Sequence, residues 1–207
     1  MPPKKFRAGS GEKVFQSRSF RGWTRGVFLR SALLVALAVT GGIKTAHAQT
    51  VSHEYQITAV FMLNFAQFTD WPTNAFEHPD SPLVIGILGS DPFGALIDDA
   101  LRNERVNGRK FIVQRYLRVE DVKTCHILFI SLSEARRLDK IVADLQGRPI
   151  LTVSEIENSA YHGVCVRLLT ANNKIRLRIN TDSLKAAQLT MSSQLLRVAE
   201  IVSAAKK

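Results

Sequence analysis

The chain contains little cysteine and comparatively few acidic residues. Of its 207 residues, 18 are Asp or Glu against 28 Lys or Arg, and only two are Cys, which do not form a Cys-x-x-Cys pair. The sequence also lacks a Gly-x-Ser-x-Gly elbow, a Gly-x-Gly-x-x-Gly fingerprint and a Walker lysine. These absences argue against disulfide exchange, α/β-hydrolase chemistry and the common modes of dinucleotide and nucleotide binding.

The excess of basic residues is confined to the start of the chain. Nine Lys and Arg and a single Glu precede Gln49, whereas the rest of the chain has 19 basic and 17 acidic residues. A nearly neutral chain lacks the strong positive field with which proteins bind nucleic acid. We therefore expect no nucleic-acid partner.

Residues 1–48 are predicted to be a cleavable secretory signal. A long basic region precedes the apolar stretch 31–43, and Ala46-His-Ala48 follows as an Ala-x-Ala cleavage site. Thirteen helical residues would span roughly 20 Å, which is short of the ~30 Å hydrocarbon core of a bilayer. The sequence thus predicts export to the periplasm, cleavage after Ala48 and no stable membrane insertion afterwards. An uncleaved signal anchor is the alternative.

Residues 49–207 are expected to form one α/β domain. Apolar residues recur at spacings of three and four from Ser52 to Trp71, which predicts a long N-terminal amphipathic helix. Strands and helices then alternate, so we predict a three-layer α/β/α sandwich with a mostly parallel sheet and an antiparallel edge hairpin. Strands are predicted at 83–88, 111–116, 126–130, 149–153, 164–169 and 174–179. Helices are predicted at 95–104, 119–123, 133–145 and 181–202, the last with a break near 190 left open.

The loop after the first predicted strand is a candidate ligand site. It lies at the carboxyl end of a parallel strand, where open α/β sheets place their ligands, and it leads into a helix whose amides can hold an anion. Asp91 would repel a phosphate, so we favour Asp91 and Pro92 as the N-cap and first residue of that helix. The candidate ligand loop consists of Gly89, Ser90, Asp91, Phe93 and Gly94.

The predicted N-terminal helix carries an aromatic stripe. Such a stripe is more often part of a core than an interface. If other helices already fill that face of the sheet, part of the stripe remains for a partner helix or for a second copy of the chain, as in a homodimer. The candidate partner surface consists of Phe61, Phe65, Phe68 and Trp71.

Cys125 and Cys165 permit a disulfide in an oxidising compartment. A bridge closing a loop of about 41 residues would contribute roughly 4 kcal/mol, and two buried free thiols are the equally weighted alternative. With His126 and His162 the cysteines supply the residue types of a zinc site. Adjacent strand residues point to opposite faces, so Cys125 and His126 would not readily share an ion, and we expect no metal.

No set of residues has the pattern of a catalytic centre. Ser131 and Ser154 follow predicted strands and are interpreted as turn caps, because no nucleophile motif surrounds them. Glu134 and Glu155 are single carboxylates on polar segments. We therefore predict no catalytic residue, no cofactor and no enzymatic activity.

Four segments of the sequence resemble the YfiR-like family of periplasmic regulators. They include a helix that ends Asn64-Phe-x-x-Phe-x-x-Trp-Pro72 and the loop Gly89-x-Asp-Pro-Phe-Gly94, which are specific in combination. The resemblance covers essentially all of the chain after residue 48. After Gly163 the sequence departs from the strand usual in the family. The segments are 54–72, 88–94, 125–130 and 147–154.

The resemblance implies a regulator rather than an enzyme. The best-understood members hold down the activity of an inner-membrane diguanylate cyclase by binding its periplasmic sensor portion. It therefore implies a membrane-bound cyclase as partner and a role in cyclic-di-GMP signalling and biofilm formation. Relatives also sit beside sensor histidine kinases. A small-ligand binding module that feeds a kinase or another receptor, and uses the loops after Leu88, Ile130 and Val153, is therefore the alternative function.

Overall fold

The computed structural model describes residues 42–171 and 174–203, with side chains from residue 53 onward. The predicted signal peptide lies, as far as residue 41, outside the described residues. The chain divides into two compact units, Met1–Ala48 and Gln49–Lys207, and the second contains the α/β domain. Within the described ranges, no helix combines the length and the hydropathy needed to cross a bilayer.

Helix α2 spans Gly42–Gln67 and therefore begins before the predicted start at Ser52. Its last turns bury apolar side chains spaced as one helical face requires. Two residues after the helix, the chain enters the short strand β1, and Pro72 then prevents further helix. The buried face consists of Ala59, Met62, Phe65 and Ala66.

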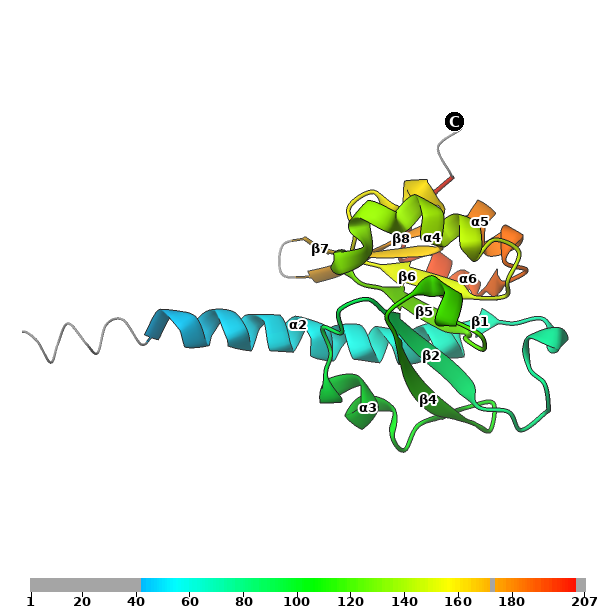
Figure 1. Ribbon diagram of the computed structural model, residues 1–207, viewed down its shortest axis with the longest axis horizontal. Helices are drawn as coiled ribbons and strands as arrows, with labels where there is room; N and C mark the ends of the chain where they lie inside the picture. The colour runs from blue at the N-terminus through cyan, green and yellow to red at the C-terminus, as the bar shows by residue number, and fades with distance from the viewer. Residues whose placement is uncertain (1–41, 172–173, 204–207) are drawn as a thin grey trace, which may run out of the picture. The chain divides into compact units, whose positions relative to one another are not determined.

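The main sheet has eight strands in the order β10-β8-β7-β6-β5-β2-β4-β3. Figure 1 labels those from β8 to β4. β3 runs antiparallel to β4 and β7 antiparallel to β8, and the other neighbours are parallel. A separate pair joins β1 to β9. The strands are β1 Thr69–Asp70, β2 Leu83–Leu88, β3 Arg105–Val106, β4 Arg109–Tyr116, β5 Ile127–Ile130, β6 Leu151–Ser154, β7 Val166–Ala171, β8 Lys174–Asn180, β9 Thr190–Met191 and β10 Glu200–Val202.

The predicted α/β fold with a mostly parallel sheet is confirmed. Alternate residues of the buried strands face two different cores, because strand side chains point to opposite faces in turn. In β5, Ile127 and Phe129 join the core under α2 and α3 (Ala95–Leu101). Leu128 and Ile130 join the core under α4 (Leu138–Asp144) and the 3-10 helix η2 (Val119–Asp121).

The last part of the chain differs from the prediction. Residues 181–202 form α5 (Thr181–Ala186), β9, α6 (Ser193–Leu196) and β10, so the predicted helix over this range is wrong. β10 pairs in parallel with β8 and covers its outer side. The β7-β8 hairpin therefore lies one strand in from the edge of the sheet.

The starts of two helices differ in detail from the prediction. Ser131 caps the 3-10 helix η3 (Leu132–Arg137), which begins one residue before the predicted start at 133 and leads into α4. Helix α3 begins at Ala95 with Gly94 as its N-cap, so the prediction of Asp91 as the N-cap residue is wrong. The predicted helix at 119–123 is reduced to the single 3-10 turn η2.

The two cysteines are free and buried, so the disulfide considered from the sequence is not present. Cys165 belongs to the core under α2, whereas Cys125 belongs to the core under α4. The sheet therefore separates the two thiols. Burial raises the pKa of Cys125 to about 12 and also raises that of Cys165, so both thiols stay protonated at neutral pH.

Candidate functional site

The loop after β2 is held closed by its own side chains. Asp91 Oδ1 accepts backbone hydrogen bonds from Phe93 N at 2.7 Å and Gly94 N at 3.2 Å. Its other oxygen accepts from Arg115 Nε at 2.7 Å. Asp91 thus caps the turn that precedes α3, and both carboxylate oxygens are engaged within the protein.

Gly89 begins this loop in a conformation that suits glycine. Its φ is +91°, and a Cβ there would lie 2.8 Å from Glu134 Oε1. Next to it, Ser90 N donates to Ser133 Oγ at 2.9 Å. The loop after β2 is therefore packed directly against the start of η3, and Phe93 is buried with its ring centre 4.9 Å from that of Phe129 in β5.

Beside this loop, Tyr55 of α2 donates a hydrogen bond from its hydroxyl to Glu155 Oε2 at 3.1 Å. Burial, and then the neighbouring Glu155, raises the pKa of Tyr55, so the phenol remains a donor. Burial also raises the pKa of Glu155, although the hydrogen bond from Tyr55 opposes that shift. Glu155 directly follows β6, so the pair lies at the carboxyl edge of the sheet.

A small cavity of about 270 Å³ adjoins Glu155. Glu54 lines it and accepts a hydrogen bond from Thr170 Oγ1. Arg167 of β7 also lines it, and its Nε is buried without a hydrogen-bond partner. An unpartnered guanidinium nitrogen beside two carboxylates is a polar arrangement that a small zwitterionic ligand would satisfy.

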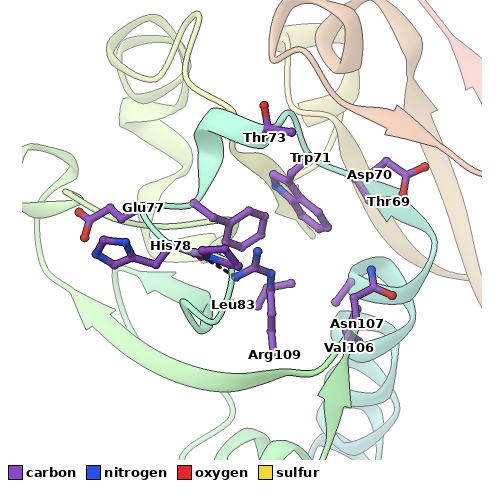
Figure 2. Close-up of a pocket in the computed structure, with 13 residues that line it drawn as sticks. Thr69, Asp70, Trp71, Thr73, Glu77, His78, Leu83, Val106, Asn107 and Arg109 are labelled. Carbon is purple, nitrogen blue, oxygen red and sulfur yellow. Dashed lines mark hydrogen bonds between the residues drawn. The ribbon is translucent and has the colours of Figure 1, made fainter.

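A larger cleft of about 560 Å³ lies at the opposite, amino-terminal edge of the central strands. Figure 2 shows Trp71 and Arg109 pointing toward each other in this cleft. The Arg109 guanidinium lies 3.7 Å from the centre of the Phe76 ring, a cation-π geometry. Thr69 also lines the cleft, and its buried Oγ1 has no hydrogen-bond partner.

His126 lies next to this cleft, where its ring stacks on that of Phe76. Its Nδ1 accepts a hydrogen bond from Val84 N at 3.0 Å, so the proton lies on Nε2, which donates to Ala75 O at 3.1 Å. Burial, together with the positive charge of Arg109, lowers the pKa of His126 despite the bond to Ala75. The imidazole is therefore a neutral structural link between β5, β2 and the segment after α2.

A third hollow of about 590 Å³ lies between α4 and α5. His162, at the end of the 3-10 helix η4 (Ser159–His162), lines it and lies 2.8 Å from Asp139 of α4. Cys165 also lines this hollow. The four residues weighed as a zinc site are thus dispersed, and within residues 53–171 and 174–203 no three His, Cys, Asp or Glu side chains gather as metal ligands.

The predicted aromatic stripe is mostly covered. Phe65 is fully buried, and Phe61, Phe68 and Trp71 are partly buried against the core under α2. Trp71 Nε1 donates to His126 O at 3.2 Å, so its polar end is also engaged. Among the α2 side chains from residue 53 onward, the large apolar ones that are exposed are instead Ile57 and Val60.

The serines interpreted as turn caps have that role. Ser131 Oγ accepts from Ser133 N, and Ser154 Oγ accepts from Ile156 N at 3.1 Å. Of the carboxylates considered, Glu134 is buried and accepts from Arg137 at 2.6 Å. These groups are occupied by structural contacts.

Sequence reasoning overlooked the contribution of Phe76 and Arg109 to the large cleft. Both lie outside the predicted amphipathic elements, Phe76 in the polar stretch after Pro72 and Arg109 before the predicted strand at 111–116. The only signal was the isolated aromatic residue in a polar, proline-containing segment. An aromatic residue there indicates a segment that folds back onto the domain.

Among solved structures, a partial match to this chain is found at low sequence identity. It is a conserved domain protein from Vibrio cholerae O1 biovar eltor, with 10% sequence identity and a TM-score of 0.44. The match covers 57% of this chain and 54% of that one. Among curated proteins, none matches the sequence.

The family comparison is more specific. The YfiR/HmsC-like family matches residues 55–200, which is most of the chain and nearly all of the α/β domain. The chain therefore belongs to the YfiR/HmsC-like family. This family consists of periplasmic, generally non-enzymatic regulatory proteins, and membership implies a regulator of a diguanylate cyclase.

Proposed function

We propose that this chain is exported, loses residues 1–48, and regulates a membrane diguanylate cyclase by binding the cyclase's periplasmic sensor portion. The observation that carries the proposal is the family match over residues 55–200. A binding protein regulates without chemistry when it prefers one conformation of its receptor, because the difference in affinity shifts the receptor's equilibrium. Cyclic-di-GMP levels and biofilm formation then follow the cyclase.

The contacts around the candidate groups support a binding role. The carboxylates of Asp91 and Glu134 are held by arginines, and the imidazole of His126 is held by backbone groups. Such groups stabilise loops against one another and keep the surface of the domain in a fixed shape. A fixed surface is what selective binding to one receptor conformation needs.

The direct test is co-purification from membranes. The tagged chain is crosslinked in intact cells, and proteins that copurify are identified. A diguanylate cyclase with a periplasmic segment is the expected partner, and the same chain expressed without residues 1–48 in the cytoplasm is the control. The proposal would be contradicted if the exported chain recovered no cyclase, whether or not the cytoplasmic control did.

A second candidate function is binding of a small ligand at the carboxyl edge of the sheet. The cavity beside Glu155 favours it, because Arg167 Nε is buried there without a partner. Bound ligand would stabilise the fold by RT ln(1 + [L]/Kd). Thermal unfolding with fractionated periplasmic extract should then show a rise in Tm that Arg167→Met abolishes. The absence of any rise across the fractions would remove this candidate.

A further inference from the structure

Two leucines are exposed where the central strands end. Leu117 directly follows β4 and is 80% exposed, and Leu132 opens η3 just after β5 and is 54% exposed. Single exposed leucines are ordinary on protein surfaces, but these two flank the same loop. β2 lies between β4 and β5, and the loop that follows it begins at Gly89.

The strand register places these leucines on one edge. Tyr116, Leu88 and Ile130 lie in a row across β4, β2 and β5. Neighbouring strands are about 4.8 Å apart, so the ends of β4 and β5 are separated by about 10 Å. That spacing suits one inserted side chain or one face of a helix.

Hydrogen bonds fix the three chain segments together. Gly89 N donates to Tyr116 O at 2.9 Å, and Ser131 N donates to Leu88 O at 3.0 Å. The bond from Ser90 N to Ser133 Oγ is a second link between the segments that follow β2 and β5. We call the surface formed by Leu117, Ser90 and Leu132 the leucine platform.

The helix η3 extends the platform. A 3-10 helix has three residues per turn, so Leu132 and Ala135 lie on the same side of it, and Ala135 is also exposed. Ser131 caps the start of η3 and fixes the direction in which Leu132 leaves the sheet. The apolar atoms are therefore presented from a rigid backbone, which reduces the entropy that binding would cost.

Charged residues of both signs surround the platform. Arg115 is held by Asp91 and Asp98. Arg118, in contrast, is 65% exposed and lies 3.5 Å from a single carboxylate. Arg136 is exposed, and none of the ion pairs among the described residues includes it.

This surface has the anatomy of a protein interface. An apolar centre with a polar, charged rim is typical of such interfaces, whereas binding to an anionic lipid surface relies on a field of one sign. The paired acidic residues on the rim and the nearly neutral charge of residues 49–207 disfavour the lipid. Arg118 and Arg136 leave positive charge for an acidic partner.

We propose that the leucine platform is the docking surface for the periplasmic part of the partner cyclase. The partner segment presents an apolar side chain between Leu117 and Leu132 and acidic residues opposite Arg118 and Arg136. This inference rests on the proposed function and assigns a surface to it.

The test compares exported full-length chains in the membrane co-purification. Leu117→Ser combined with Leu132→Ser should lower recovery of the cyclase by about tenfold or more, as expected when the centre of an interface is lost. Val198→Ser is the matched control, because Val198 is 73% exposed at another edge and should leave recovery unchanged. Circular dichroism and thermal unfolding check that both variants fold.

The outcomes separate the two proposals. If the unaltered chain recovers no cyclase, the proposed function fails, and the docking surface fails with it. If the unaltered chain and the double variant recover the cyclase equally, only the docking surface fails. A lipid surface is tested by flotation with vesicles of phosphatidylethanolamine and phosphatidylglycerol. The proposal would be overturned if the unaltered chain bound the vesicles, the double variant did not, and both recovered the cyclase equally. That result would assign the platform to the membrane.

Discussion

Phe76 stacks on His126 with ring centres 4.3 Å apart and ring planes inclined by 16°. The stack joins the segment that follows α2 to the start of β5. The Arg109 guanidinium lies 3.7 Å from the centre of the Phe76 ring, so Phe76 contacts both a cation and an imidazole. Aromatic contacts therefore join the segments at the amino-terminal edge of the sheet, whereas hydrogen bonds and ion pairs join those at the carboxyl edge.

The stack predicts a pH-dependent stability. The pKa of His126 is lowered in the fold, whereas the unfolded chain has the ordinary value of about 6.5. Between these two values the unfolded state binds more protons, so the free energy of unfolding should fall as the pH falls below about 6.5. Denaturant unfolding across this range measures the effect.

His126→Asn should flatten this pH dependence, because the titrating group is gone. His162→Asn is the control, since His162 lies on the surface and should leave the dependence largely unchanged. An NMR titration of the unaltered protein provides a check that does not require a folded variant. A measured His126 pKa at the ordinary value of about 6.5 would show that burial does not lower the pKa of this imidazole.

Gly89→Ala should destabilise the domain by about 2 kcal/mol or more, because an alanine would be strained at φ +91° and would also meet Glu134. Gly108→Ala separates the two causes. Gly108 also has a positive φ, of +80°, but its Cβ position is open, so only strain of about 1 kcal/mol is expected. Equal losses for both variants, measured by chemical denaturation, would argue against the close packing at Gly89.

Asp91→Ala should cost about 1 to 2 kcal/mol of stability, because two backbone amides lose their acceptor and Arg115 loses a partner. Asp99→Ala is the comparison. Asp99 forms an exposed pair with Arg102, and its loss should change stability by less than about 0.5 kcal/mol. If Asp91→Ala had the same free energy of unfolding as the unaltered protein, the loop after β2 would not depend on this carboxylate.

The cysteines should react only after unfolding. Both thiols are buried and protonated, so a thiol reagent should modify neither in the native protein and both in denaturant. Mass spectrometry under non-reducing conditions should show the mass of two free thiols. A mass lower by about two hydrogens would instead reveal an oxidised pair.

Much of the sheet could be predicted because most of its strands coincide with short runs of apolar or alternating residues in the sequence. The run Leu83–Leu88 is apolar throughout and is β2, as the uniform burial of a central parallel strand requires. The three residues of β10 are different. Their leucine- and valine-rich surroundings repeat at helical spacing, and only the pairing with β8, distant in sequence, makes them a strand.

The candidate ligand loop and its surroundings were harder to predict, because they too depend on contacts between residues distant in sequence. The sequence pattern located the loop that begins at Gly89 and placed it at the end of a strand. It did not show that Arg115 would donate a hydrogen bond to Asp91. The sequence patterns gave no indication of Leu117 and Leu132, which lie exposed after their strands end. Which face of the sheet holds Cys125 and which holds Cys165 depends on register, and loop length alone does not determine it.

The most direct test of the regulatory role is the cyclic-di-GMP content of cells that lack this chain. Deletion should raise cyclic-di-GMP, and expression of the chain with residues 1–48 should restore the original level, because the exported domain would again restrain its cyclase. Cyclic-di-GMP that is unchanged by deletion and by restored export would contradict the account.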